Sequence, residues 1–130
     1  MKLWGSVALI TMLLLSLSII HLCIQTTQAD SPCTQHAQYT GIIDSIDRVH
    51  NTVKLYDPQG RVVDPIMGRV SMVVHTSAAT HIYIAHSNAC QSANLQDLKP
   101  GQKLAVWPKE EMVIQIYPLP LSAATIVITS

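Results

Sequence analysis

Short runs of alternating hydrophobic and polar residues follow one another through residues 39–129, and these runs are rich in β-branched side chains. A two-residue period is typical of strands that bury one face, and Gly, Pro and Asn separate the runs. The pattern predicts strands over residues 39–47, 52–57, 69–75, 81–84, 102–107, 112–117 and 123–129. In the first strand, we expect Ile42 and Ile46 to share the buried face.

One short helical signal interrupts the strands. Asn94 can cap a turn over residues 95–98, and Pro100 and Gly101 end it. This order of elements predicts an all-β fold, a small five- to six-stranded OB-like Greek-key barrel with one short helical turn. A small β-sandwich is the alternative fold.

The N-terminal stretch differs sharply from the rest of the chain. Residues 3–24 contain no Lys, Arg, Asp or Glu, Lys2 precedes them, and small residues lead to Ala29. This pattern predicts a signal peptide over residues 1–29 that is cleaved after Ala29. The alternative is an uncleaved N-terminal membrane anchor, because the apolar run is just long enough to cross a bilayer. The predicted location is therefore secreted or extracytoplasmic, with membrane contact only if the signal is retained.

The predicted organisation after the leader is simple. A polar segment over residues 30–38 carries Cys33, and a single barrel domain follows over residues 39–130. Outside the leader the chain has two cysteines, Cys33 and Cys90, and an even number in a small exported domain predicts a disulfide. Eight basic and eight acidic residues give no net charge, which argues against a nucleic-acid partner.

The last third of the chain carries a recognisable series of motifs. Residues 94–107 read NLQDLKPGQKLAVW, and a Tyr117-Pro118 step and a final strand over residues 123–128 follow. These motifs resemble an uncharacterised YobA-like family of small exported domains and lipoproteins from Gram-positive, spore-forming bacteria. The chain departs from that pattern at Pro120, where the family usually has Gln, and it lacks a lipoprotein cysteine. The resemblance implies a fold and a compartment, and it assigns no activity or catalytic residue.

Four possible metal ligands occur as two pairs. Cys33 and His36 form one pair, and His86 and Cys90 form the other. Such a set could bind zinc or copper, with or without the cysteines. The competing interpretation is that the disulfide uses both sulfurs and the histidines only flank it. No other cofactor is expected.

Two tyrosines are candidates for ligand stacking. Tyr56 and Tyr83 lie on predicted outward faces, where a glycan or a peptide could stack on them. The simpler interpretation is that both rings cover the barrel surface.

No catalytic set is visible in the sequence. Asp44 and Asp47 are an odd number of residues apart on a predicted strand and should face opposite sides. Glu110 and Glu111 follow Pro108 in an expected turn. The sequence therefore predicts an exported, non-enzymatic binding or accessory module of the bacterial envelope with an unknown ligand. An extracytoplasmic metal-handling protein is the first alternative, and a small hydrolase is the second.

Overall fold

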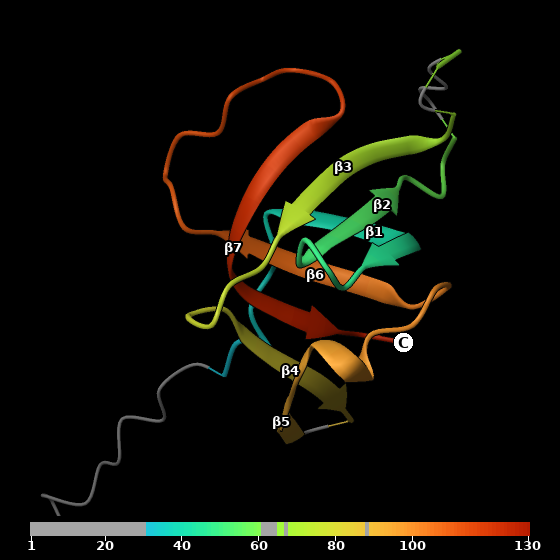
Figure 1. The fold of residues 1–130 in the computed structure, drawn as a ribbon. Coiled ribbons are helices and arrows are strands. Elements are labelled where there is room, and N and C mark those ends of the chain that lie inside the picture. The colour runs from blue at the N-terminus through green and yellow to red at the C-terminus, as the bar shows by residue number, and fades with distance from the viewer. Residues whose placement is uncertain (1–30, 61–64, 67, 88) are drawn as a thin grey trace, which may run out of the picture.

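The computed structural model describes residues 31–60, 65–66, 68–87 and 89–130. The predicted signal peptide and its cleavage point after Ala29 lie outside these residues. The described chain forms seven strands and one short 3₁₀ turn (Figure 1), namely β1 (Tyr39–Asp47), β2 (Thr52–Tyr56), β3 (Val70–His75), β4 (His81–His86), β5 (Ala89–Ala93), η1 (Leu95–Asp97), β6 (Lys103–Pro108) and β7 (Leu119–Ile128).

Five of these strands close into a mixed barrel. Their order is β3-β2-β1-β6-β7, and a parallel pairing of β3 with the first half of β7 joins the two edges. This arrangement confirms the predicted small OB-like barrel, because the barrel strands follow in chain order as β1, β2, β3, β6 and β7. Closure pairs β3 with β7 and so removes the two free edges that these five strands would have as an open sheet.

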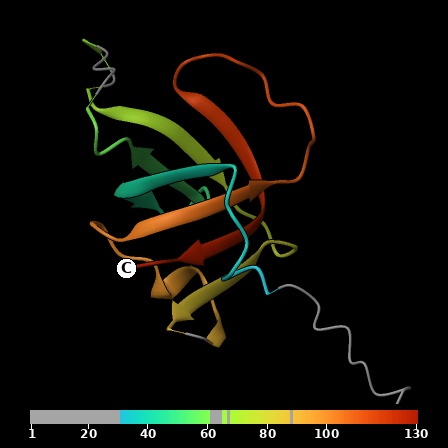
Figure 2. The same ribbon diagram turned by 180° about the vertical axis from the view of Figure 1, so that it is seen from behind.

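The remaining two strands extend the sheet beyond one end of the barrel. β4 pairs in parallel with the second half of β7, from His81 opposite Thr125 to Ile84 opposite Ile128. β5 returns antiparallel along β4 and forms the outer edge of the sheet. Residues 31–38 run along the side of the barrel from this end to the start of β1 (Figure 2).

Alternating side chains of the strands fill the barrel. Val53, Val74, Leu104, Val106 and Ile126 are completely buried and belong to one hydrophobic cluster. In β2, β3 and β6 every second residue packs in this cluster, as the hydrophobic alternation of the sequence predicts.

The predicted inward face of β1 is wrong by one residue. The register against β2 shifts between Ile43 and Ser45, so the strand has a bulge at Asp44. A bulge inserts one residue and changes the alternation beyond it. Ile43 and Ile46 therefore pack on the core, whereas the expected pair was Ile42 and Ile46.

The helical turn forms where the sequence predicts it. The Asn94 side-chain oxygen accepts a hydrogen bond from the Gln96 amide at 3.0 Å, and the Asn94 amide donates to an Asp97 carboxylate oxygen at 2.9 Å. This reciprocal cap satisfies amides that the short turn leaves unpaired. Leu98 follows the turn and is fully buried in the core cluster.

The predicted strand over residues 112–117 is wrong. This segment belongs to the long connection between β6 and β7, residues 109–118, which stands out from the barrel wall in both ribbon views (Figures 1 and 2). Residues 112, 114 and 116 alternate as in a strand, but closure of the barrel leaves no free edge beside them for backbone pairing. The final strand instead begins earlier than predicted, at Leu119.

Candidate functional site

The two cysteines of the described residues are joined. The sulfurs of Cys33 and Cys90 are 2.06 Å apart, and their α-carbons are separated by 5.6 Å. The bond ties the segment before β1 to β5, the outer strand of the sheet. Because it uses both sulfurs, the four-ligand metal arrangement does not exist while the disulfide is intact.

The two histidines of that hypothesis do not form a prepared metal site. His86 lies at the end of β4, where its Nε2 is 3.0 Å from the Gln91 side-chain oxygen, and His36 is exposed. Among the described residues, no three His, Cys, Asp or Glu side chains come together as a group that could hold a metal. Binding of zinc or copper by His36 and His86 alone stays a prediction.

Tyr56 is part of a polar cluster at one end of β2 and β3. The Arg69 guanidinium lies 4.0 Å from the centre of the Tyr56 ring, and the Arg69 Nε donates to an Asp44 carboxylate oxygen at 2.7 Å. The Asp44 hydrogen bond raises the pKa of Arg69 above its ordinary value. One face of the Tyr56 ring is therefore already covered by a side chain of the same molecule.

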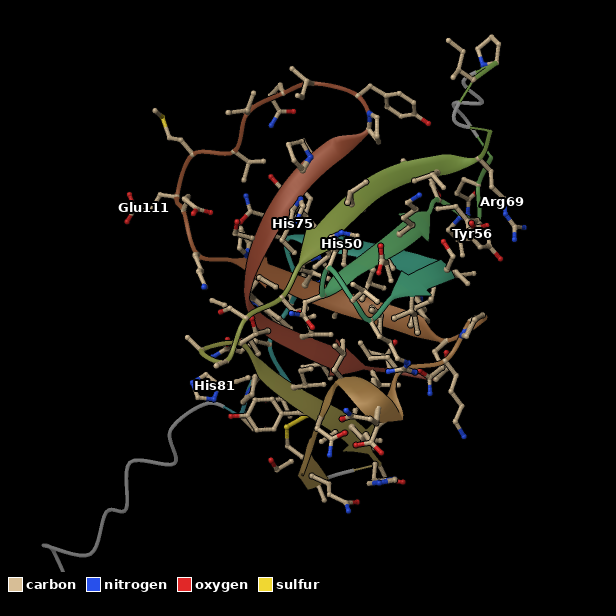
Figure 3. All side chains as sticks on the ribbon, viewed as in Figure 1. His50, Tyr56, Arg69, His75, His81 and Glu111 are labelled. Carbon is tan, nitrogen blue, oxygen red and sulfur yellow. A yellow bond between two sulfur atoms is a disulfide. The ribbon has the colours of Figure 1, made fainter. Side chains whose placement is uncertain are left out.

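Tyr83 lies elsewhere. It is on β4, where its ring stacks on that of His81 with centroids 6.5 Å apart and planes 19° apart. Figure 3 places His81 at the opposite end of the molecule from Tyr56 and Arg69. The two tyrosines predicted as stacking residues therefore do not form one platform.

The acidic residues of β1 have separate roles. Asp44 holds Arg69, whereas Asp47 accepts hydrogen bonds from the backbone amides of Val49 and His50 at 3.0 and 3.1 Å. The second Asp47 oxygen is 2.6 Å from Nδ1 of His50. This contact, followed by the backbone hydrogen bonds, lowers the pKa of Asp47. Both carboxylates are thus engaged in local structure, and they are not paired with each other.

The feature that sequence reasoning missed is the apolar character of the β6–β7 loop. Met112, Ile114 and Ile116 are 89%, 69% and 60% exposed. Val113, between the first two, instead packs against the hydrophobic core. The sequence signal for this loop was available, since the alternation of residues 112–117 is bounded by Pro108 and Pro118.

The root of the loop is fixed to the barrel. The Lys109 amide donates to the Ser122 carbonyl at 2.8 Å, and the Lys109 Nζ donates to the Ser77 hydroxyl at 3.0 Å. Further along, the Ile116 amide donates to the Ile114 carbonyl at 3.0 Å. These contacts and the packing of Val113 fix the loop that carries the exposed side chains to the barrel.

A cavity of about 280 Å³ lies between this loop and the barrel wall. His75, at the end of β3, and Ser122, on β7, are paired in register, and both line the cavity from the barrel. The other lining residues are Glu110, Met112, Val113, Ile114 and Pro120. Figure 3 shows Glu111 pointing outward, away from the barrel.

A second cavity of about 370 Å³ lies at the β4–β5 end of the barrel. The β1–β2 turn, the β3–β4 connection, β4 and the start of η1 contribute its lining, which contains no charged residue. It offers hydroxyl and amide groups but no charge to select an ionic ligand.

The loop occupies a position with a known use in this kind of barrel. It joins the fourth and fifth barrel strands, and in OB-type barrels this loop and the loop between the first two strands flank the ligand-binding face. The chain is a small OB-like barrel whose connection between the fourth and fifth barrel strands carries exposed apolar side chains. Function does not follow from a fold alone, and it depends on the chemistry of the side chains that the barrel presents.

No family model, curated protein or solved structure matches the chain. The resemblance to the YobA-like family therefore stays a prediction. No helix in the described part of the chain is long and apolar enough to cross a membrane.

Proposed function

We propose that the protein is an extracytoplasmic binding module whose β6–β7 loop binds a peptide segment of a partner protein. The observation that carries the proposal is the gathering of Met112, Ile114 and Ile116 on one exposed loop. Exposed apolar side chains that occur together, unlike isolated ones, are typical of interaction sites.

The chemistry of the loop favours a peptide over a glycan. Sugars are bound by stacking on aromatic rings, but one face of Tyr56 is covered by Arg69, and Tyr83 stacks on His81. The single aromatic ring of the loop, Tyr117, is 40% exposed, less than each of the three apolar side chains Met112, Ile114 and Ile116. Met112, Ile114 and Ile116 are apolar and carry no aromatic ring, and the flexible thioether of Met112 can adapt to apolar peptide side chains of different shape.

The charges near the loop indicate what else the peptide contains. Glu110 and Glu111 precede the exposed apolar residues, and neither forms an ion pair among the described residues. The one basic residue of the loop, Lys109, has its ammonium group on Ser77. The loop therefore presents apolar and negatively charged groups, and these complement a peptide with apolar and basic side chains.

An extracytoplasmic location fits the disulfide between Cys33 and Cys90, because disulfides persist outside the reducing cytoplasm. Residues 1–29, which resemble a signal peptide, also support export from the cytoplasm. Intact mass of protein recovered from the medium of an exporting host tests both points. We expect a chain that begins at Asp30 and is two hydrogens lighter than its reduced form, and a chain that keeps its leader and has free thiols would contradict export.

Selection of displayed random peptides against the exported protein tests the binding function. One variant carries Met112→Ser, Ile114→Ser and Ile116→Ser, and its matched control carries leucine at the same three positions. We expect peptides that bind the wild type and the leucine variant and lose at least about tenfold in affinity for the serine variant, because several buried apolar contacts are lost. Failure to select any peptide, or equal binding to the serine variant, would overturn the proposal.

A further inference from the structure

We infer that the cavity beneath the β6–β7 loop is a pocket for one basic side chain, lysine or arginine, of the bound peptide. This inference rests on the proposed peptide-binding function and names the group that the site would select. It depends on the walls of the cavity, on its one charged side chain and on the position of Lys109.

The walls suit a long aliphatic stem. Met112, Val113 and Ile114 line the cavity from the loop side, and Pro120 lines it from β7. These side chains present carbon and sulfur atoms, which favour the methylene groups of lysine or arginine over a short polar side chain. The cavity volume of about 280 Å³ leaves room for a whole side chain.

The polar part of the lining suits a positive head group. Glu110 is the residue of the lining that carries a full negative charge, and it is exposed to solvent. A charge at this place can pair with a cation that extends beyond the apolar walls. His75 and Ser122 add groups that form hydrogen bonds on the barrel side.

No cation of the described residues already occupies this position. The ion pairs of the described chain join His50 to Asp47 and Arg69 to Asp44. Lys109, the basic residue next to Glu110, directs its ammonium group to Ser77, which lines the second cavity instead. The Glu110 carboxylate is therefore available to a cation of the partner.

The test compares two small probes of equal chain length, n-hexylammonium chloride and 1-hexanol. Each probe is titrated into the isotopically labelled protein that is recovered from the medium of the exporting host. The backbone amide resonances are followed by NMR. We expect n-hexylammonium to shift the amide resonances of residues 110–114, 119, 121 and 122, because Pro120 has no backbone N–H. We also expect it to bind about two- to fivefold more tightly than hexanol, the range typical of an exposed ion pair.

Two matched variants identify the charge responsible. Glu110→Gln should abolish the preference for the ammonium probe and leave hexanol binding unchanged, because it removes the charge and keeps the shape. Glu111→Gln should leave the preference as in the wild type, since Glu111 points away from the barrel (Figure 3). Both variants keep the apolar walls and the core intact, so loss of folding does not confuse the result.

Other outcomes overturn the inference. Equal affinity for the two probes would show an apolar cavity without cation selectivity, and no shift of these resonances would show that the cavity takes no aliphatic chain. A preference that survives Glu110→Gln would place the charge elsewhere. Because these measurements use no peptide, they can fail while loop-dependent peptide binding succeeds, and the reverse is also possible.

Discussion

The β1–β2 turn and the β6–β7 loop both connect neighbouring strands of the barrel. The side chains of the turn bind backbone groups of the same domain, whereas most apolar side chains of the loop are exposed to solvent. In the turn, Asp47 accepts two backbone amides, and Arg48 donates to the carbonyl groups of Leu95 and Leu98 at 2.7 and 3.1 Å. In the loop, Lys109 and Val113 hold the connection, while three aliphatic side chains project into solvent.

The comparison separates side chains that stabilise the fold from side chains that contribute little to its stability. The polar side chains of the turn satisfy backbone groups, and Arg48 ties the turn to η1 across the chain. The exposed side chains of the loop bury little surface and so contribute little to the stability of the folded domain. Side chains that do not stabilise the fold can contact a partner protein without a cost to folding.

Loss of the disulfide should produce the largest change in stability. In the chain-entropy model, closing a segment with a sequence separation of 57 stabilises the folded state by about 4 kcal/mol. Cys33→Ser together with Cys90→Ser should lower the free energy of unfolding in urea by about that amount. Peptide binding measured on the fraction that is folded should be unchanged, because β5 and the β6–β7 loop lie at different ends of the molecule (Figure 1). A parallel loss of binding would show that the two ends are coupled.

The same substitution placed inside the barrel and on the loop should have very different effects. Ile126 is fully buried and Ile114 is 69% exposed. Ile126→Ala should destabilise the domain by about 3 kcal/mol, because it leaves a cavity in the core. Ile114→Ala should change stability by less than about 0.5 kcal/mol. Urea unfolding of both variants checks this contrast, and a large effect of Ile114→Ala would mean that the loop is a part of the core.

Substitution of Arg48 should have an intermediate effect on the free energy of unfolding. Arg48→Ala removes two hydrogen bonds to carbonyl groups at η1, and we expect a loss of about 1 to 2 kcal/mol in the free energy of unfolding. Arg48→Lys is the matched control. Its single ammonium group cannot reproduce the fork of the guanidinium, and about half of the loss should persist. Equal stability of the alanine variant and the wild type would show that the turn is not held by these contacts.

Features that depend on local sequence chemistry or on the number of cysteines were predictable from the sequence. The Asn94 cap, the alternation of β2, β3 and β6 and the pairing of Cys33 with Cys90 were all inferred correctly. Each follows from local chemistry or from an even number of cysteines in a small domain.

Within the correctly predicted barrel, details that depend on which strands pair were not predictable. β5 was missed because residues 89–93 are small and mostly polar, without the hydrophobic alternation that indicates a strand. The segment around Ile114 had that alternation but no free strand edge to join. The contact of Tyr56 with Arg69 and the separation of Tyr56 from Tyr83 are likewise set by the closed barrel.

The smallest effect should be a dependence of stability on pH that comes from Asp47 in the β1–β2 turn. The pKa of Asp47 is lowered in the folded state, mainly by its hydrogen bond with His50. A carboxylate whose pKa is lower in the folded state stabilises the fold above its unfolded pKa of about 4, and this contribution is lost as the pH falls through the folded value. Melting temperatures between about pH 6 and pH 3 should therefore fall less steeply for Asp47→Asn than for the wild type.

Two further variants decide whether this pH dependence belongs to the turn. His50→Ala removes the main cause of the lowered Asp47 pKa and should reduce the slope in the same direction as Asp47→Asn. Ile114→Ala changes no titrating group and should follow the wild-type curve. If His50→Ala keeps the wild-type slope, the backbone amides of the turn, and not the imidazole, stabilise the Asp47 carboxylate.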